Sequence, residues 1–190
     1  MRVILVVFFF LASSMSLAGK DLMQIEISGQ IEGVVEIELL SDLAPNHVNQ
    51  IKKLIINKQY DGVAFHRVIE GFMAQTGDVM FGNISNNEYS PTMVGRGGSQ
   101  LKDLIAEFSS QPFDRGIVGM ARSQDPNSAN SQFFIMLKEG HFLNGNYTVF
   151  GKVISGMDIV DSIKKGDKSN NGMISKNPDF MKRVLIFSKN

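Results

Sequence analysis

Residues 65–78 combine a permanent cation with several apolar side chains and an amide, and they read FHRVIEGFMAQTGD. If this stretch forms a strand, alternation puts Phe65, Arg67 and Ile69 on one face, and Gly71 then interrupts the run. A guanidinium carries its charge at any physiological pH. The sequence therefore predicts a cationic donor that shares a wall with apolar side chains.

The neighbouring residue types limit the chemistry of such a wall. The chain contains no cysteine, and the stretch has no serine beside a base, no pair of carboxylates and no histidine cluster with ligand spacing. Covalent, glycosidic and metal-assisted chemistry therefore lack their groups. What remains is to bind a neutral, partly apolar substrate and to stabilise a lone pair. In the alternative interpretation the arginine extends out of a sheet wall and pairs with Glu70 or Asp78, and this stretch alone does not decide between the two.

A second run, residues 116–137, contains two apolar segments joined by a loop rich in Asn, Ser and Pro. We interpret it as two short strands. Alternation puts Gln132 and Phe134 on one face, and Phe133 and Ile135 on the other. Phe133 is expected in the core, whereas a glutamine flanked by core aromatics must find a partner or face a cleft.

The other elements are also short, and they indicate the fold class. Alternating apolar residues predict further strands, and apolar stripes of helical period predict two helices, the first of which should cover an open end or face of the sheet. The strands are 22–28, 34–40, 147–153 and 182–187, and the helices start at Pro45 and cover 157–163. Because strands and helices do not alternate along the chain, the sequence favours a mainly antiparallel closed barrel in one domain, residues 19–190.

The N-terminus has the three-part pattern of a signal peptide. A cation follows Met1, an apolar run ends at Leu11, and Ser16 and Ala18 place small residues at a cleavage site. Removal of residues 1–18 would leave 172 residues (190 minus 18). The run is too short to span a membrane, so we expect a secreted or periplasmic, soluble product without stable membrane insertion.

The charge balance gives no indication of a polyanionic partner. Lys and Arg total 19, Asp and Glu total 19, and removal of Arg2 with the signal peptide leaves a net charge of about −1 (18 minus 19). Neither nucleic-acid binding nor an electrostatic membrane anchor is predicted. The glycines within 95–98 precede neither a Lys-Ser/Thr pair nor a helix pattern, so we interpret them as turns and not as a phosphate cradle.

Several separated motifs, in this order, resemble the cyclophilin-type peptidyl-prolyl isomerases. They are residues 65–78, 119–121, 130–135 and 149–153. The resemblance covers about Met23 to Phe187, and the signal peptide points to exported bacterial members. It implies the family fold, a mainly β, closed eight-stranded antiparallel β-barrel capped by two α-helices. It also implies catalysis of rotation about X-Pro peptide bonds, assistance of protein folding after export, and neither a cofactor nor a metal.

The resemblance further implies roles for individual residues, carried over position by position. The catalytic set would be Arg67 as the cation, with Phe72, Gln132 and Phe134. The proline-ring pocket would be formed by Phe72, Met73, Phe134 and Leu143, with Phe142 on its rim. The other substrate-binding residues would be Gln75 and Ala121 along the peptide backbone, together with Gln132, then His66 at the edge of the site, and Tyr147 where many eukaryotic members carry histidine.

The expected partners follow from these assignments. They are proline-containing peptides and unfolded or partly folded proteins, and the protein is expected to be a monomer. Weak binding of cyclosporin is expected, because Phe142 stands where strongly inhibited members have tryptophan. The alternative is a non-catalytic peptide-binding or chaperone module that uses the same groove. Loss of the cation or of the pocket aromatic would mark such a module, and Arg67, Phe72 and Phe134 are all present.

Overall fold

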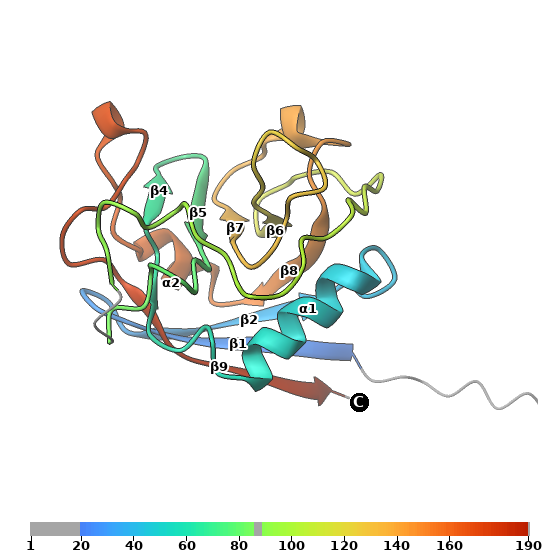
Figure 1. Ribbon diagram of the computed structural model, residues 1–190, viewed down its shortest axis with the longest axis horizontal. Helices are drawn as coiled ribbons and strands as arrows, with labels where there is room; N and C mark the ends of the chain where they lie inside the picture. The colour runs from blue at the N-terminus through green and yellow to red at the C-terminus, as the bar shows by residue number, and fades with distance from the viewer. Residues whose placement is uncertain (1–19, 86–88, 190) are drawn as a thin grey trace, which may run out of the picture.

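The strands of the described residues form one curled sheet, with two α-helices beside it (Figure 1). The figure shows the computed structural model, which describes residues 20–85 and 89–189. In chain order the elements are β1 (Lys20–Ser28), β2 (Gly33–Leu39), α1 (Pro45–Ile56), β3 (Val63–Ala64), β4 (Arg67–Ile69), β5 (Met73–Thr76), β6 (Ile117–Met120), β7 (Phe133–Met136), the 3₁₀ turn η1 (His141–Leu143), β8 (Val149–Ser155), α2 (Met157–Ser162), the 3₁₀ turn η2 (Lys168–Asn170) and β9 (Phe180–Lys189).

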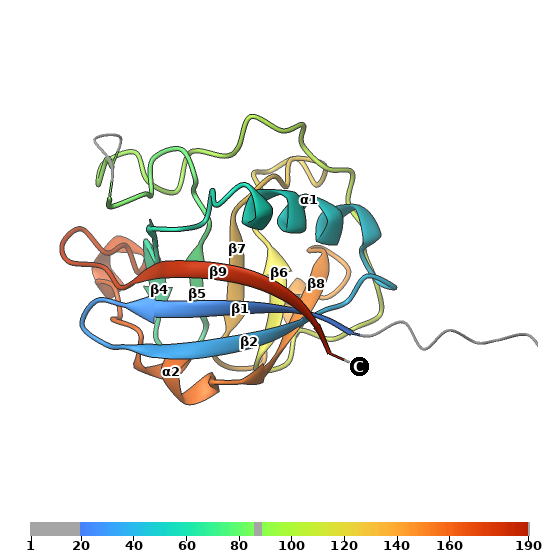
Figure 2. The ribbon, with the colours of Figure 1, turned by 90° about the horizontal axis from the view of Figure 1, so that it is seen from below.

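The first two predicted strands form a hairpin, and both predicted helices are present. β1 and β2 pair antiparallel, with Ile25 opposite Val35 and both side chains buried. Proline is favourable at the start of α1, because the first helical residues need no N–H donor. The apolar stripe of this helix is buried and consists of Val48, Ile51, Leu54 and Ile55. Figure 2 shows α1 along one side of the curled sheet, next to β9, and α2 on the opposite side.

The sheet differs from the predicted closed eight-stranded barrel. The described residues form nine strands in the order β3-β9-β1-β2-β8-β6-β7-β5-β4, and neighbouring strands in this order pair antiparallel. This order is open, because β3 and β4 lie at its two ends. The fold is therefore a strongly curled half-barrel of nine strands with two helices.

The reason for the extra strand lies at residues 63–69. The chain pairs with β9 through Val63 and Ala64 and with β5 through residues 67–69, so one extended stretch changes partner. Between the two ladders, the Phe65 N–H donates to the Asp179 carbonyl at 2.8 Å. The two ends of the sheet are thus joined by the covalent chain, and one predicted strand becomes two.

Two apolar clusters lie on opposite faces of the short strands. The larger cluster fills the interior of the curl and includes Phe65, Phe133, Ile135 and Phe150. The smaller one lies outside it and consists of Met73, Phe113, Ile117, Phe134, Met136, Leu143 and Val149. The smaller cluster is the one that carries the candidate site.

The predicted signal peptide, residues 1–18, falls outside the described residues. Within 20–85 and 89–189, no helix combines the length and the apolar character that a bilayer span requires.

Candidate functional site

The register of three strands brings the predicted catalytic cation next to its predicted neighbours. Arg67 on β4 lies opposite Gln75 on β5, and Gln75 lies opposite Phe134 on β7. Phe134 in turn lies opposite Gly119 on β6. A Cβ atom at Gly119 would come within 2.7 Å of the Phe134 ring, so the absence of a side chain makes room for it. One row across four strands therefore presents a cation, an amide and an aromatic ring on the outer face.

Arg67, Gln75 and Phe134 line a cavity of about 310 Å³. Its walls are Arg67, Phe72, Met73, Gln75, Ala121, Arg122, Phe134, Phe142, Leu143 and Tyr147. Aromatic contacts support the apolar part, since Phe72 lies 5.5 Å from Phe142 and Phe134 lies 5.8 Å from Tyr147, measured between ring centroids. Nine of the eleven site residues predicted from the sequence meet here, all except His66 and Gln132.

Arg67 has no carboxylate among the hydrogen-bond partners that the described residues provide. Its Nη1 donates to Gln75 Oε1 at 3.1 Å, while its Nε and Nη2 donate to the carbonyl and side-chain oxygens of Asn171 at 3.0 and 2.9 Å. Glu70 pairs instead with Lys168. The two oxygens of Asp78 accept four backbone N–H groups, from Met80, Phe81, Gly95 and Gly97. The ion-pair interpretation of Arg67 is therefore wrong for both candidate acids.

Burial affects the electrostatics of this guanidinium. It is half-buried, and burial lowers the pKa of Arg67 from its usual value, an effect that the nearby Tyr147 opposes. Because an arginine pKa lies far above neutrality, the group remains charged. An unpaired cation beside apolar side chains can stabilise electron density on a bound ligand more strongly than it could in water.

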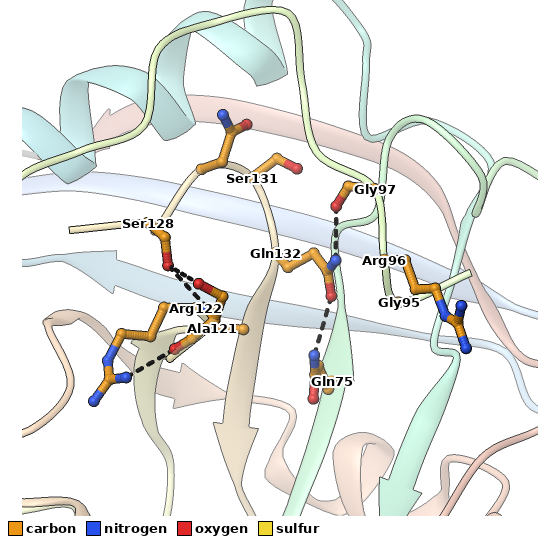
Figure 3. Close-up of a pocket in the computed structure, with 11 residues that line it drawn as sticks. Gln75, Gly95, Arg96, Gly97, Ala121, Arg122, Ser128, Ser131 and Gln132 are labelled. Carbon is orange, nitrogen blue, oxygen red and sulfur yellow. Dashed lines mark hydrogen bonds between the residues drawn. The ribbon is translucent and has the colours of Figure 1, made fainter. Parts of the chain in front are cut away.

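Gln132 contacts the site through an amide chain and not through the wall of this cavity. Its Nε2 donates to the Gly97 carbonyl at 2.7 Å, and its Oε1 accepts from Gln75 Nε2 at 3.0 Å (Figure 3). Gln75 Oε1 then faces Arg67. Each amide thus has a fixed orientation, and the prediction that Gln132 finds a partner or faces a cleft is confirmed in both respects.

A second cavity of about 260 Å³ is drawn in Figure 3. The two share Gln75, Ala121 and Arg122. The rest of its wall is polar or glycine and consists of Gly95, Arg96, Gly97, Ser123, Ser128, Asn130, Ser131 and Gln132. The turns predicted around 95–98 therefore border the site. The two cavities, one lined mainly by apolar side chains and the other by polar groups, therefore adjoin along this shared wall.

His66 lies behind the wall of the second cavity, since a Cβ atom at Gly95 would come within 3.2 Å of its ring. Its side chain is buried, with 1% exposed, and it lines neither cavity. Burial lowers the pKa of His66 to about 4, although the charge of Asp78 partly opposes the shift. The ring is therefore neutral at physiological pH, and its buried position leaves it outside both cavity walls.

Sequence reasoning missed two residues at the site. Arg122 lies over the Tyr147 ring at 4.4 Å and donates to the Asn146 carbonyl at 2.8 and 3.1 Å. Its position directly after the predicted groove residue Ala121 was the available indication. Asn171 holds Arg67 from a loop more than a hundred residues away in sequence, and no local pattern indicates that contact.

Among the described residues, no group of three or more His, Cys, Asp or Glu side chains is placed to hold a metal ion.

Comparison with known proteins agrees with this geometry. Residues 22–186 match the family described as cyclophilin type peptidyl-prolyl cis-trans isomerase/CLD. A probable peptidyl-prolyl cis-trans isomerase of Brucella suis is 65% identical over 155 residues, which cover 82% of this chain and 78% of that protein. A peptidyl-prolyl cis-trans isomerase of Acinetobacter baylyi is 37% identical over 166 residues, which cover 83% of this chain and 82% of that one.

A solved structure shows the same fold. It is that of a Cryptosporidium parvum cyclophilin type peptidyl-prolyl cis-trans isomerase in the presence of the dipeptide Ala-Pro. The TM-score is 0.72 at 27% sequence identity, and the match covers 88% of this chain and 99% of that one. The chain therefore belongs to the cyclophilin family and is an enzyme of the peptidyl-prolyl cis-trans isomerase class.

Proposed function

We propose that the 310 Å³ cavity binds the proline ring of an X-Pro peptide and that Arg67 is the catalytic group. The observation that carries this proposal is a half-buried guanidinium, free of a carboxylate partner among the described residues, in the wall of an apolar cavity. The Cryptosporidium parvum relative was solved in the presence of Ala-Pro, which supports a prolyl ligand for the fold. Phe72, Met73, Phe134 and Leu143 surround the ring, and Phe142 forms the rim.

The mechanism follows from the chemistry of the amide. The barrier to rotation is about 20 kcal/mol, because the nitrogen lone pair is delocalised into the carbonyl. Rotation localises this lone pair on the prolyl nitrogen. A guanidinium N–H directed at that nitrogen binds the twisted amide better than either planar isomer, which is the differential binding that catalysis requires. No proton is transferred.

Magnitudes show that the cation does not act alone. A turnover of about 1 to 10³ per second, against roughly 10⁻² per second without catalyst, requires about 3 to 7 kcal/mol. A hydrogen bond from a charged group contributes about 1.5 to 3 kcal/mol. The apolar wall supplies much of the remainder, since it holds the ring and excludes the water that stabilises the planar amide. The amide chain of Gln75 and Gln132 keeps the peptide groove and Arg67 in one arrangement.

The test is catalysis by Arg67→Ala on an Ala-Pro peptide, followed by protease coupling or by NMR exchange. We expect kcat/KM to fall about ten- to a hundredfold, which corresponds to the loss of one charged hydrogen bond. Arg67→Lys should recover little, because an ammonium does not reproduce the planar fork. Arg183→Ala is the matched control, since Arg183 pairs with Glu26 on the surface. If Arg67→Ala keeps more than about a third of wild-type kcat/KM, the mechanism is wrong.

The site of action is the second part of the proposal. Residues 1–18 direct export and are removed, and the mature monomer acts in the periplasm on X-Pro bonds of unfolded and partly folded proteins. In support, β1 starts at Lys20, so cleavage after Ala18 leaves every described element intact. Mass spectrometry of the protein from a periplasmic fraction tests this, with an N-terminus at Gly19 as the expected result. An intact Met1 in that fraction, or recovery only from the cytoplasm, would contradict it.

A further inference from the structure

The loop at residues 166–174 lies along the outer edge of β4, the strand that carries Arg67. Backbone hydrogen bonds join them, since the Val68 N–H donates to the Gly172 carbonyl at 2.8 Å and the Gly166 N–H donates to the Val68 carbonyl at 2.9 Å. Arg67 and Met173 form an isolated antiparallel bridge. Because β4 ends the sheet, this loop takes the place of the missing neighbouring strand.

At the tip of this loop, Asn171 directs two oxygens at the guanidinium. Its backbone is left-handed, with φ of 51°, a conformation in which asparagine is among the more common non-glycine residues. The Asn171 carbonyl oxygen accepts from Arg67 Nε at 3.0 Å, and its Oδ1 accepts from Arg67 Nη2 at 2.9 Å. Two adjacent nitrogens of the planar group are therefore held by one residue.

Hydrogen bonds within the loop fix its conformation. The Asp167 side chain accepts from the Ser169 N–H at 2.8 Å and from its hydroxyl at 2.7 Å, and the Asp167 carbonyl accepts from the Gly172 N–H at 2.8 Å. Gly172 also permits close approach, since a Cβ atom there would lie 2.5 Å from the Ile69 side chain. Asn171 thus lies in a turn whose residues before and after it are held in place by these contacts.

A count of donors shows what this contact does. Guanidinium has five N–H groups, of which two donate to Asn171 and one to Gln75. The groups that remain are on Nη1, which also contacts the Met73 sulfur at 3.9 Å in the cavity wall, and on Nη2. Without Asn171, Gln75 alone would hold the group through one nitrogen, and the guanidinium plane could rotate about that bond.

We propose that Asn171 is a positioning residue for the isomerase reaction, which fixes the plane of the Arg67 guanidinium so that its free N–H groups face the bound prolyl amide. The proposal rests on the proposed role of Arg67. Asn171 itself touches no substrate. Its removal should lower kcat more than it changes KM, because the planar substrate relies on the cavity whereas the twisted amide relies on the direction of the cation.

Asn171→Gly is the sharpest variant, because glycine keeps the left-handed backbone and the carbonyl acceptor and removes only Oδ1. We expect kcat to fall about five- to tenfold, with KM within twofold of wild type. Asn171→Asp keeps an Oδ1 acceptor but pairs the cation with a carboxylate, so it should hold the guanidinium plane without recovering the lost kcat. The control is Asn177→Gly, which makes the same substitution at another exposed left-handed asparagine, with φ of 48°, outside both cavities.

A second measurement separates this proposal from the proposed function. In wild type, the Arg67 Nη1 and Nη2 should give separate ¹⁵N resonances, because both are held by acceptors, and in Asn171→Gly they should exchange faster, because Nη2 has lost its acceptor. This readout does not depend on turnover, so a failure of Arg67 as the catalytic group would leave it unchanged. The proposal is overturned if Asn171→Gly keeps kcat within twofold of wild type, or if the exchange rate between the two resonances is the same as in wild type.

Discussion

The two faces of the ladder between β5 and β7 have the same strand geometry, but one face is part of the core and the other lines the candidate site. On the inner face, Ala74 lies opposite Ile135 and Thr76 opposite Phe133, and all four side chains are fully buried. The one polar group there, the Thr76 hydroxyl, donates to the Ala64 carbonyl at 2.9 Å. Nothing on this face is left to bind a ligand.

The outer face of the same ladder is built from Met73 opposite Met136 and Gln75 opposite Phe134. It also packs apolar side chains, but its Gln75 amide forms hydrogen bonds with Arg67 and Gln132. Met73, Gln75 and Phe134 of this face line the 310 Å³ cavity. Alternation alone therefore makes one face a core and the other a site. The difference is whether each polar group is satisfied within the fold or left directed at a cavity.

Phe133 and Phe134 give the largest expected contrast between the faces. Phe133 is fully buried and packs edge-on against Tyr60 and Phe150, so Phe133→Ala should lower the free energy of unfolding by about 3 to 5 kcal/mol. Phe134 borders the cavity and stacks on Phe113, so Phe134→Ala should cost less stability, about 1 to 3 kcal/mol, yet lower kcat/KM at least about tenfold.

Urea unfolding and the Ala-Pro assay at equal concentrations of folded protein measure both quantities. Phe133→Ala should retain most of its activity once correction is made for the unfolded fraction. The comparison of faces fails if Phe134→Ala is as unstable as Phe133→Ala and fully active.

The next effect concerns His66, a buried group that lies behind Gly95 in the wall of the second cavity. Its pKa is about 4 in the fold, against an ordinary value of about 6.5. Below pH 6.5 the unfolded chain takes up a proton that the folded chain does not bind, so stability falls as the pH drops from about 6.5 to about 4. The full loss is on the order of 3 kcal/mol, at 1.36 kcal/mol for each pH unit between the two pKa values.

His66→Gln isolates this contribution, because carboxylates titrate in both proteins over the lower part of the range. Urea unfolding at several pH values should show a smaller loss of stability for the variant between about pH 6.5 and pH 5, where few carboxylates titrate. Parallel curves for the two proteins would show that His66 is not buried in the neutral form.

A smaller effect is expected at the rim of the site face. Phe142 is 71% exposed and packs against Phe72, and it has no N–H to donate. Loss of one neutral hydrogen bond costs about 0.5 to 1.5 kcal/mol, and an acceptor left unpaired costs about 1 to 3 kcal/mol. Cyclosporin should therefore bind roughly ten- to a hundredfold more weakly than to members that carry tryptophan at this position.

Phe142→Trp should restore sensitivity with little change in turnover, as measured by inhibition of the Ala-Pro assay. Phe142→Leu is the control, because it also lacks a donor and should remain weakly inhibited. An inhibition constant that does not change in Phe142→Trp would mean that the rim is not formed by residue 142.

The sequence allowed much of the site to be predicted, because its parts depend on local alternation. The faces of Gln132, Phe133 and Phe134 follow from a period of two residues, and the helix that starts at Pro45 follows from an apolar stripe. What could not be predicted depends on which distant segments meet. The change of partner at Phe65 and the contact between Asn171 and Arg67 are set by packing of segments that no local pattern links.

The last prediction is that kcat/KM of the folded enzyme does not change with pH near neutrality. No group that titrates between about pH 6 and pH 9 takes part in the proposed step, because Arg67 stays charged and His66, with a pKa of about 4, stays neutral. Stability should thus begin to fall below about pH 6.5 through His66, while kcat/KM of the folded enzyme stays level across pH 6 to 9. The Ala-Pro assay followed by NMR exchange measures this without a coupling protease whose own pH dependence would interfere. A bell-shaped profile would instead mean that a titrating side chain transfers a proton, and it would exclude a mechanism that rests on the fixed charge of Arg67.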